Sequence, residues 1–229
     1  KISLVANIGG NLRDQQRRQD YGITQGGLTI PNYYNLKNAS SIKVDNNYYH
    51  KRVSSLYASF SLGYNDLLFV DGTVRNDWSS TLPVNANSFI YPSFTGSFVF
   101  SQLEAVRNLD WLSFGKVRLG WAQVGNDTDP YQLLKVYQAD QSFEGIPSYS
   151  LTNTLNNANL KPEITSSLEA GLNLQFFRNR LGIDVTYYNN NSRNQILPVP
   201  VSSAFGYEAK VLNAGKINNK GIEIVLTGT

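Results

Sequence analysis

The chain contains no cysteine and no methionine, and it has a single histidine, His50. The lack of cysteine excludes disulfide bonds, thiolate zinc sites and cysteine nucleophiles, and one imidazole cannot form a histidine cluster for a metal or a catalytic triad. Glu163 and Glu169 are poor candidates for a glycosidase pair, because six residues along a strand separate them by about 20 Å, whereas such pairs lie ~5 to 9.5 Å apart. We therefore expect no metal, no cofactor and no enzymatic activity.

Charged residues are also scarce, at 16% of the chain against roughly 25% in ordinary soluble domains. The 20 Lys and Arg residues exceed the 17 Asp and Glu residues by three, and the only basic cluster is Arg13, Arg17 and Arg18. This weak positive field does not indicate a protein that binds nucleic acid.

Long apolar runs are missing as well. No window approaches the ~20 consecutive apolar residues of a membrane helix, which excludes a helical membrane protein. A transmembrane β-barrel is not excluded, because only every second residue of its strands is apolar. The chain opens at Lys1 without an initiator methionine or a signal-type segment, so we expect a fragment or a processed chain.

Period-two alternation is the dominant pattern in the sequence. In the clearest run, every even-numbered residue from Leu168 to Phe176 is apolar and every odd-numbered residue from Ser167 to Gln175 is polar or glycine. Helical spacing is confined to a short stretch around residues 101–109. Similar alternating runs lie at 2–8, 55–62, 68–75, 93–101, 116–121, 181–188 and 222–226. The pattern predicts an all-β, antiparallel protein with about eight strands.

The connections between these runs alternate in length. Two are tight turns, at Asn65-Asp66 and at Arg178 to Arg180, and one of intermediate length covers residues 102–114. The others are long and polar, at residues 9–50, 78–90, 125–161 and 189–216. Short periplasmic turns that alternate with long extracellular loops are typical of outer-membrane barrels. Incomplete runs at both chain ends predict strands that are cut there, with the remaining strands supplied from elsewhere, because open edges in lipid would leave backbone groups unsatisfied.

Aromatic residues gather near the expected strand ends. Trp78, Tyr91 and Trp121 are among those at the ends next to the long connections. This distribution is similar to the interfacial girdles of membrane barrels, although aromatic residues are enriched in strands of all kinds. The girdle is therefore supporting evidence only.

Several longer motifs carry a family resemblance. They are Val74-Arg75-Asn76-Asp77-Trp78-Ser79-Ser80-Thr81-Leu82-Pro83, Tyr91-Pro92-Ser93, Lys116-Val117-Arg118, Trp121 through Tyr131, Leu160-Lys161-Pro162-Glu163, Gly182 through Tyr188, Asn194 through Leu197, Asn213-Ala214-Gly215 and Asn218 through Glu223. In their order and spacing these motifs resemble the SusC/RagA-like branch of TonB-dependent outer-membrane transporters.

The resemblance implies that residues 1–229 form the C-terminal part of a 22-stranded barrel in the bacterial outer membrane, without the plug domain or the final strands. It also implies TonB-dependent import of an oligosaccharide or peptide. The implied partners are membrane lipid, a SusD-like surface lipoprotein and TonB, which would act through the absent plug, and a homodimer of the complex stays open. A soluble or surface β-sandwich, such as an adhesin or carbohydrate-binding module, is the alternative from another class.

Candidate ligand-binding residues come from two groups, to which Asn76 is added as a nearby amide that could hydrogen-bond hydroxyls or peptide groups. Arg75 and Arg118 are charges on polar strand faces, which either contact the ligand or pair with other charges inside the barrel. Aromatic side chains in polar connections could stack on a sugar or hold a peptide side chain, or could simply pack the loops together. The full set of candidates is Arg75, Asn76, Trp78, Arg118, Tyr131, Tyr137, Phe143, Tyr149 and Tyr207. Asp127-Thr128-Asp129 lacks the further ligands of a calcium loop, so we predict a structural turn there.

Overall fold

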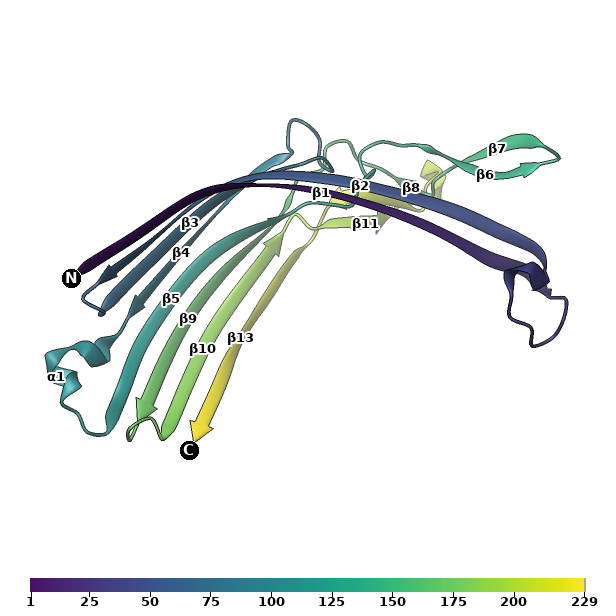
Figure 1. Ribbon diagram of the computed structural model, residues 1–229. Helices are drawn as coiled ribbons and strands as arrows, with labels where there is room; N and C mark the ends of the chain where they lie inside the picture. Colours follow the sequence, from purple (N-terminus) through teal and green to yellow (C-terminus); the bar gives the residue numbers. More distant parts are fainter. Residues whose placement is uncertain (229) are drawn as a thin grey trace.

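The computed structural model describes residues 1–228, except for the side chain of Gln141, as one main antiparallel sheet of eight strands with several smaller elements beside it; Thr229 lies outside the described residues. The sheet is strongly curved, as part of a barrel wall would be (Figure 1). Its strands, in spatial order, are β1 (Ile2–Leu28), β2 (Ala39–Tyr64), β3 (Leu68–Ser79), β4 (Ser88–Phe98), β5 (Leu112–Asn126), β9 (Glu163–Phe176), β10 (Leu181–Arg193) and β13 (Lys216–Gly228). The predicted all-β antiparallel fold and the number of strands in its sheet are confirmed.

The two predicted tight turns are present. Asn65 and Asp66 both have positive φ, at 49° and 54°, and lead directly from β2 into β3. Such backbone angles match the right-handed twist of a hairpin, and Asn and Asp tolerate them better than most residues. Phe177, Arg178 and Asn179 also have positive φ and join β9 to β10.

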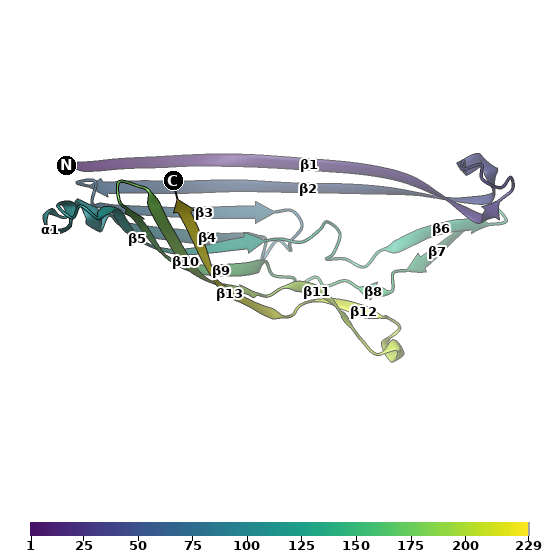
Figure 2. The ribbon, with the colours of Figure 1, turned by 90° about the horizontal axis from the view of Figure 1, so that it is seen from below.

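The segment expected to be the longest loop, residues 9–50, is instead mostly strand. β1 and β2 run on as a two-stranded ribbon far beyond the rest of the sheet, and their register is unbroken from Ile2–Tyr64 to Gln25–Ser41 (Figure 2). The prediction of a loop was wrong because this ribbon is polar on both faces. Alternation reports a strand only where one face is apolar, so it gives no signal where a strand leaves the membrane.

The remaining connections contain small elements of their own. The long connection after β5 forms the hairpin of β6 (Tyr137–Phe143) and β7 (Ile146–Leu151), and its short strand β8 (Thr154–Leu155) joins β11 (Ile196–Pro200) and β12 (Ala209–Asn213) in a three-stranded sheet. The expected helical stretch is confirmed as η2 (Phe100–Gln102) and α1 (Glu104–Arg107); η1 (Leu36–Asn38) and η3 (Ser203–Phe205) complete the list. Within residues 1–228, no helix combines the length and the apolar character needed to cross a membrane.

The two faces of the main sheet differ in chemistry, as the alternation predicts. On β9, Leu172 lies between Val117 and Val185 of the neighbouring strands and keeps 37% of its surface exposed. Asn173, one residue on, points to the opposite face and bonds to Asp184. Exposed apolar side chains continue along the Leu172 face of every strand, which is the arrangement of a lipid-facing wall.

A small buried core lies away from this wall. It consists of Leu82 and Leu160 from two connections, Phe89 from the start of β4 and Val211 from the middle of β12. Phe89 stacks on Tyr91 of the same strand, with 5.9 Å between the ring centres, and so ties this core to the polar face of β4. The core therefore fixes the long connections against the polar, inner face of the sheet.

Candidate functional site

The inner face carries a hydrogen-bonded charge network around Arg118. Its guanidinium donates two hydrogen bonds to the carboxylate of Asp184, at 2.7 and 3.0 Å, and Asn173 donates a third at 2.7 Å. These residues belong to β5, β10 and the strand between them, β9. A bidentate pair of this kind fixes its geometry strongly. Arg118, a predicted ligand contact, is thus engaged in cross-linking the barrel wall.

Arg75 lies in a second such network nearer the long connections. It donates to Asp77 at 2.7 Å and to the hydroxyl of Ser55 at 3.0 Å, and its guanidinium lies 5.9 Å from the ring centre of Tyr91. The hydroxyl of Tyr91 donates to Asp77. Tyr91 therefore faces inward, so its inclusion in a lipid-facing girdle was wrong. Arg75 has less than half of its side chain open to solvent.

Asp127 fastens the connection that follows β5. Its carboxylate accepts hydrogen bonds from the ammonium group of Lys51 on β2 and from the hydroxyl of Ser79 on β3, and only 9% of the Asp127 side chain is exposed. The predicted structural role of this acidic stretch agrees with these contacts. Among residues 1–228, no group of three or more potential metal-ligating side chains comes together.

A row of cavities follows the inner face of β2 from its outer end toward the barrel wall. Their volumes are about 860, 630, 290 and 380 Å³ in that order. The first two share Asn47 and Gln138, the next pair shares Tyr49, and the last pair shares Lys51. Because each cavity shares lining residues with the next, the four cavities adjoin one another in a row along β2.

We call this feature the β2 groove and define it by the inward side chains Lys43, Asp45, Asn47, Tyr49 and Lys51. From Lys43 to its inner end at Ser55 it runs twelve residues along β2, which corresponds to about 40 Å. Its walls offer amides, a tyrosine ring and charges of both signs. The groove is suited to a long, polar ligand that is held at several points.

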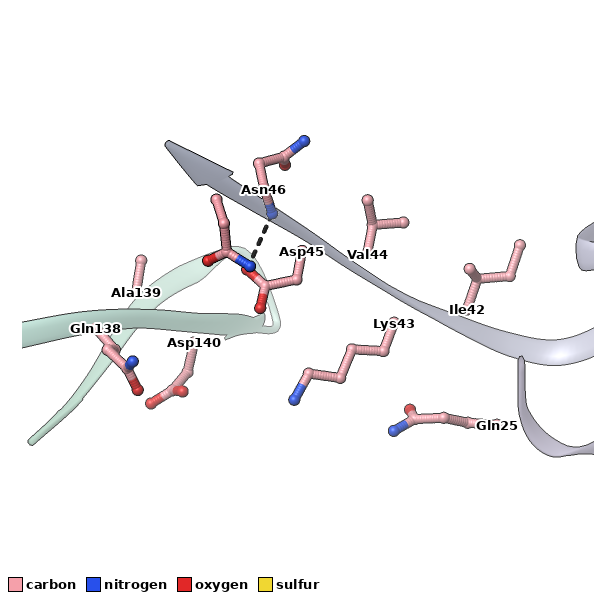
Figure 3. Close-up of a pocket in the computed structure, with 10 residues that line it drawn as sticks. Gln25, Ile42, Lys43, Val44, Asp45, Asn46, Gln138, Ala139 and Asp140 are labelled. Carbon is pink, nitrogen blue, oxygen red and sulfur yellow. Dashed lines mark hydrogen bonds between the residues drawn. The ribbon is translucent and has the colours of Figure 1, made fainter. Parts of the chain in front are cut away.

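The outer end of the groove lies between β2 and β6, and Figure 3 shows its lining. Here the carboxylate of Asp45 accepts a hydrogen bond from the hydroxyl of Tyr21 at 3.2 Å and another from the backbone N–H of Asn46 at 2.9 Å. The bond to Asp45 raises the pKa of Tyr21, because it opposes loss of the phenolic proton. Lys43 and Asp140 extend into the same space from opposite strands (Figure 3).

The predicted aromatic residues are divided between several places. Tyr131 lines the second cavity of the groove, beside Tyr49. Tyr137, Phe143 and Tyr149 lie on the β6–β7 hairpin, and each exposes about two thirds of its surface or more. They do not line the cavities described above. The ammonium group of Lys135 lies over the ring of Tyr207, 4.9 Å from the ring centre. Tyr207 thereby packs the connection after β11 against the connection after β5.

Two predicted residues lie on the other side of the sheet. Trp78 is not in a loop but near the end of β3, and its register opposite Ser54 and Ser88 places it on the face that carries Leu56. Asn76 is on that same face and bonds to Ser88 at 3.0 Å. The assumption that Trp78 belongs to a loop was wrong, because β3 extends farther than its alternating run.

Sequence reasoning missed the residues that define the groove. Tyr49 fell at the end of the segment interpreted as a loop, Lys51 followed directly after that segment, and no motif marks either residue. Tyr49 and Lys51 alternate with His50 and Arg52 along β2, but all four are polar or amphipathic, so hydropathy does not separate the inner from the outer face. A strand extended past Val53 would have placed Tyr49 and Lys51 on the inner side.

The comparisons with known proteins identify the family. The model of the family described as "TonB dependent receptor-like, beta-barrel" matches residues 3–229. The chain belongs to this family. TonB-dependent receptor P26 of Formosa agariphila is 26% identical over 212 residues, which cover 91% of this chain and 21% of P26. TonB-dependent receptor SusC of Bacteroides thetaiotaomicron is 28% identical over 160 residues, or 66% of this chain and 16% of SusC.

Several solved structures share the fold. The RagAB peptide transporter matches all of this chain and 26% of its own chain, with a TM-score of 0.83 and 22% identity. The siderophore receptor PirA of Acinetobacter baumannii matches 97% of this chain and 31% of its own, with a TM-score of 0.61 and 19% identity. This TonB-dependent receptor chain thus spans about a fifth of the length of the curated relatives named above.

Family membership decides between the classes considered from the sequence. TonB-dependent receptors are outer-membrane transporters and not enzymes, so the predicted β-barrel, the outer-membrane location and the SusC/RagA-like resemblance are confirmed. The β-sandwich alternative is excluded, because the family model covers nearly the whole chain. The exposed apolar face of the sheet is accordingly the face that meets lipid.

Proposed function

We propose that this chain forms part of the barrel wall of a TonB-dependent importer and that the β2 groove guides a long, polar ligand, an oligosaccharide or a peptide, toward the barrel interior. The observation that carries the proposal is the row of adjoining cavities, which begins on the projecting ribbon of β1 and β2 and ends beside Arg75 and Asp77 on the inner wall. A compact ligand would not need contacts spread over about 40 Å.

The rest of the importer lies outside this chain in the proposal. Residues 1–229 supply eight strands, and a plug domain and the remaining strands complete a larger barrel. The coverage of 26% of the RagAB chain supports this division. Similarity to SusC and RagAB also supports a SusD-like surface lipoprotein as the cap, with TonB acting through the plug. No residue described above performs covalent chemistry in this scheme.

The experiment is uptake by cells that produce the full-length protein together with its lipoprotein. Labelled peptides and labelled oligosaccharides are supplied, with and without a protonophore that removes the proton gradient. We expect uptake of one ligand class that stops without the gradient, and we expect Tyr49→Ala to reduce it several-fold. His50→Ala is the matched control, because the neighbouring side chain points to the outer face, where it bonds to Asp14. Uptake that persists without the gradient, or that responds equally to both variants, would overturn the proposal.

A further inference from the structure

The outer half of β2 has an open edge. β2 pairs with β1 along almost its whole length, but it pairs with β3 only from Val53 to Tyr64. Beyond Val53 the neighbouring chain turns away after a single contact at Ser80. In the described part of the chain, no strand is paired with residues 42–51 on that side. Unpaired edges of this kind are templates for adding another strand.

The backbone groups at this edge can be identified. Arg52 donates its N–H to the hydroxyl of Ser80 at 2.9 Å and accepts the N–H of Ser80 at 2.9 Å, so its main-chain groups point away from β1. The main-chain N–H and C=O groups of successive residues in a strand point alternately to its two neighbouring sides, and the register of β2 with β1 is unbroken here. The main-chain groups that point to the open side therefore belong to Ile42, Val44, Asn46, Tyr48 and His50.

One of these donors already has a substitute partner. The N–H of Asn46 donates to the carboxylate of Asp45 at 2.9 Å, as Figure 3 shows. A ladder bond to β1 would have occupied this N–H, so the contact agrees with the assigned direction. Among the hydrogen bonds of the described main-chain and side-chain groups, which do not include the side chain of Gln141, none on the open side involves the N–H of Val44, Tyr48 or His50. Backbone donors at a ligand cavity are ready to bind backbone acceptors.

A second wall faces this edge. The cavity of about 860 Å³ is lined on one side by β2 residues from Ile42 to Asn47 and on the other by Gln138, Ala139 and Asp140 of β6. β6 is paired only with β7, and it is the strand of its hairpin nearer to β2 (Figure 2). The cavity thus lies between an open strand edge and a second two-stranded ribbon, and it continues into the β2 groove.

We propose that the open edge of β2 at residues 42–50 binds peptide cargo as an added antiparallel or parallel strand. The inference rests on the proposed import function and narrows its ligand class to peptides. A peptide backbone carries N–H and C=O groups at the spacing of the main-chain groups that Val44, Asn46 and Tyr48 direct to the open side, whereas a sugar chain carries no such ladder. The cavity leads inward along the β2 groove, which favours a ligand that passes through over a protein segment that stays bound at the edge.

The mixed chemistry of the cavity fits this recognition mode. Lys43, Asp45 and Asp140 present charges of both signs, and Gln25 and Gln138 add amides. No single charge or apolar pocket dominates, so affinity comes from main-chain bonds and tolerates different side chains. We therefore expect binding affinity to depend weakly on the sequence of the peptide and strongly on its main-chain N–H and C=O groups.

The first arm of the test changes the protein, as the full-length receptor with its lipoprotein in detergent. Val44→Pro removes one N–H on the open side, and proline is tolerated at an edge where that N–H takes no part in a ladder. Val44→Ala is the matched control, which shortens the same side chain and keeps the N–H. We expect Val44→Pro to weaken binding of a labelled pool of random octapeptides roughly two- to tenfold relative to Val44→Ala. Equal affinities of the two variants would overturn the proposal.

The second arm changes the ligand and leaves the protein unaltered, so it does not depend on the folding of a variant. An octapeptide methylated at every backbone nitrogen should lose most of its affinity relative to the unmodified peptide. A labelled linear hexasaccharide should not compete with the octapeptides. Binding of the hexasaccharide alone, with proton-dependent uptake, would overturn the edge proposal and leave the import function standing. Absence of energised uptake for every ligand would instead overturn the import function itself.

Discussion

The substitution Leu172→Arg tests which face of the sheet meets lipid. Leu172 lies near the middle of β9, flanked across the sheet by Val117 and Val185, and it has no polar neighbour on its own face of these strands. Arginine on the lipid side of a barrel near the bilayer midplane costs about 2 to 4 kcal/mol of folding free energy. That cost corresponds to a folding equilibrium constant lower by roughly 30- to 900-fold.

Asn173→Arg is the matched control for Leu172→Arg, one residue along the same strand. Its side chain points to the inner face, where the Asp184 carboxylate can accept a hydrogen bond from the new guanidinium in place of the lost amide. We expect a cost of about 1 kcal/mol or less there, because the inner face of such a barrel is polar and hydrated. The full-length protein is unfolded by urea in phospholipid vesicles, and the folded fraction is read from its heat-modifiable electrophoretic mobility. Equal costs for the two variants, or a larger cost for Asn173→Arg, would refute the assignment of the faces.

Two further predictions concern the inner face. Asp127→Asn removes the ion pair with Lys51, so the connection after β5 loses about 1 to 3 kcal/mol of anchoring. Limited proteolysis should therefore cut within residues 128–160 faster in Asp127→Asn than in the control Asp129→Asn. Unchanged cleavage would show that Asp127 does not fasten the connection. Gly171→Ala places a Cβ atom 2.4 Å from the side chain of Arg118 and should lower the free energy of unfolding in the same urea assay by about 1 to 2 kcal/mol. In the control Gly96→Ala the new Cβ atom meets open space and should not lower it, so equal stabilities would contradict the packing described above.

The sequence could predict the membrane-spanning wall in detail, because there each strand has one apolar and one polar side. The even-numbered residues from Leu168 to Phe176 were expected on one face, and the structure places Leu172 and Asn173 on opposite faces as that pattern requires. The two tight turns were also predictable, since Asn65 and Asp66 suit the positive φ that the hairpin imposes.

The candidate site was largely beyond the reach of the sequence. Arg118 could be placed on the inner face but not paired with Asp184, because the two residues are 66 positions apart and only the order of the strands joins them. Trp78 was assigned to a loop that is in fact strand. Tyr131 lines the groove, but the neighbours that give it this position, such as Tyr49, come from a segment without any hydropathy signal.

The sequence by itself determined the all-β class, the two faces of the wall and the family, because lipid on one side and water on the other impose a period of two on every spanning strand. Only the tertiary structure decided that β1 and β2 continue past the wall, that four cavities join into the β2 groove, and that one edge of β2 stays open. The physical reason is that water surrounds both faces of the projecting ribbon. There, backbone pairing and contacts between distant segments define the structure, and neither leaves a periodic mark on the residues.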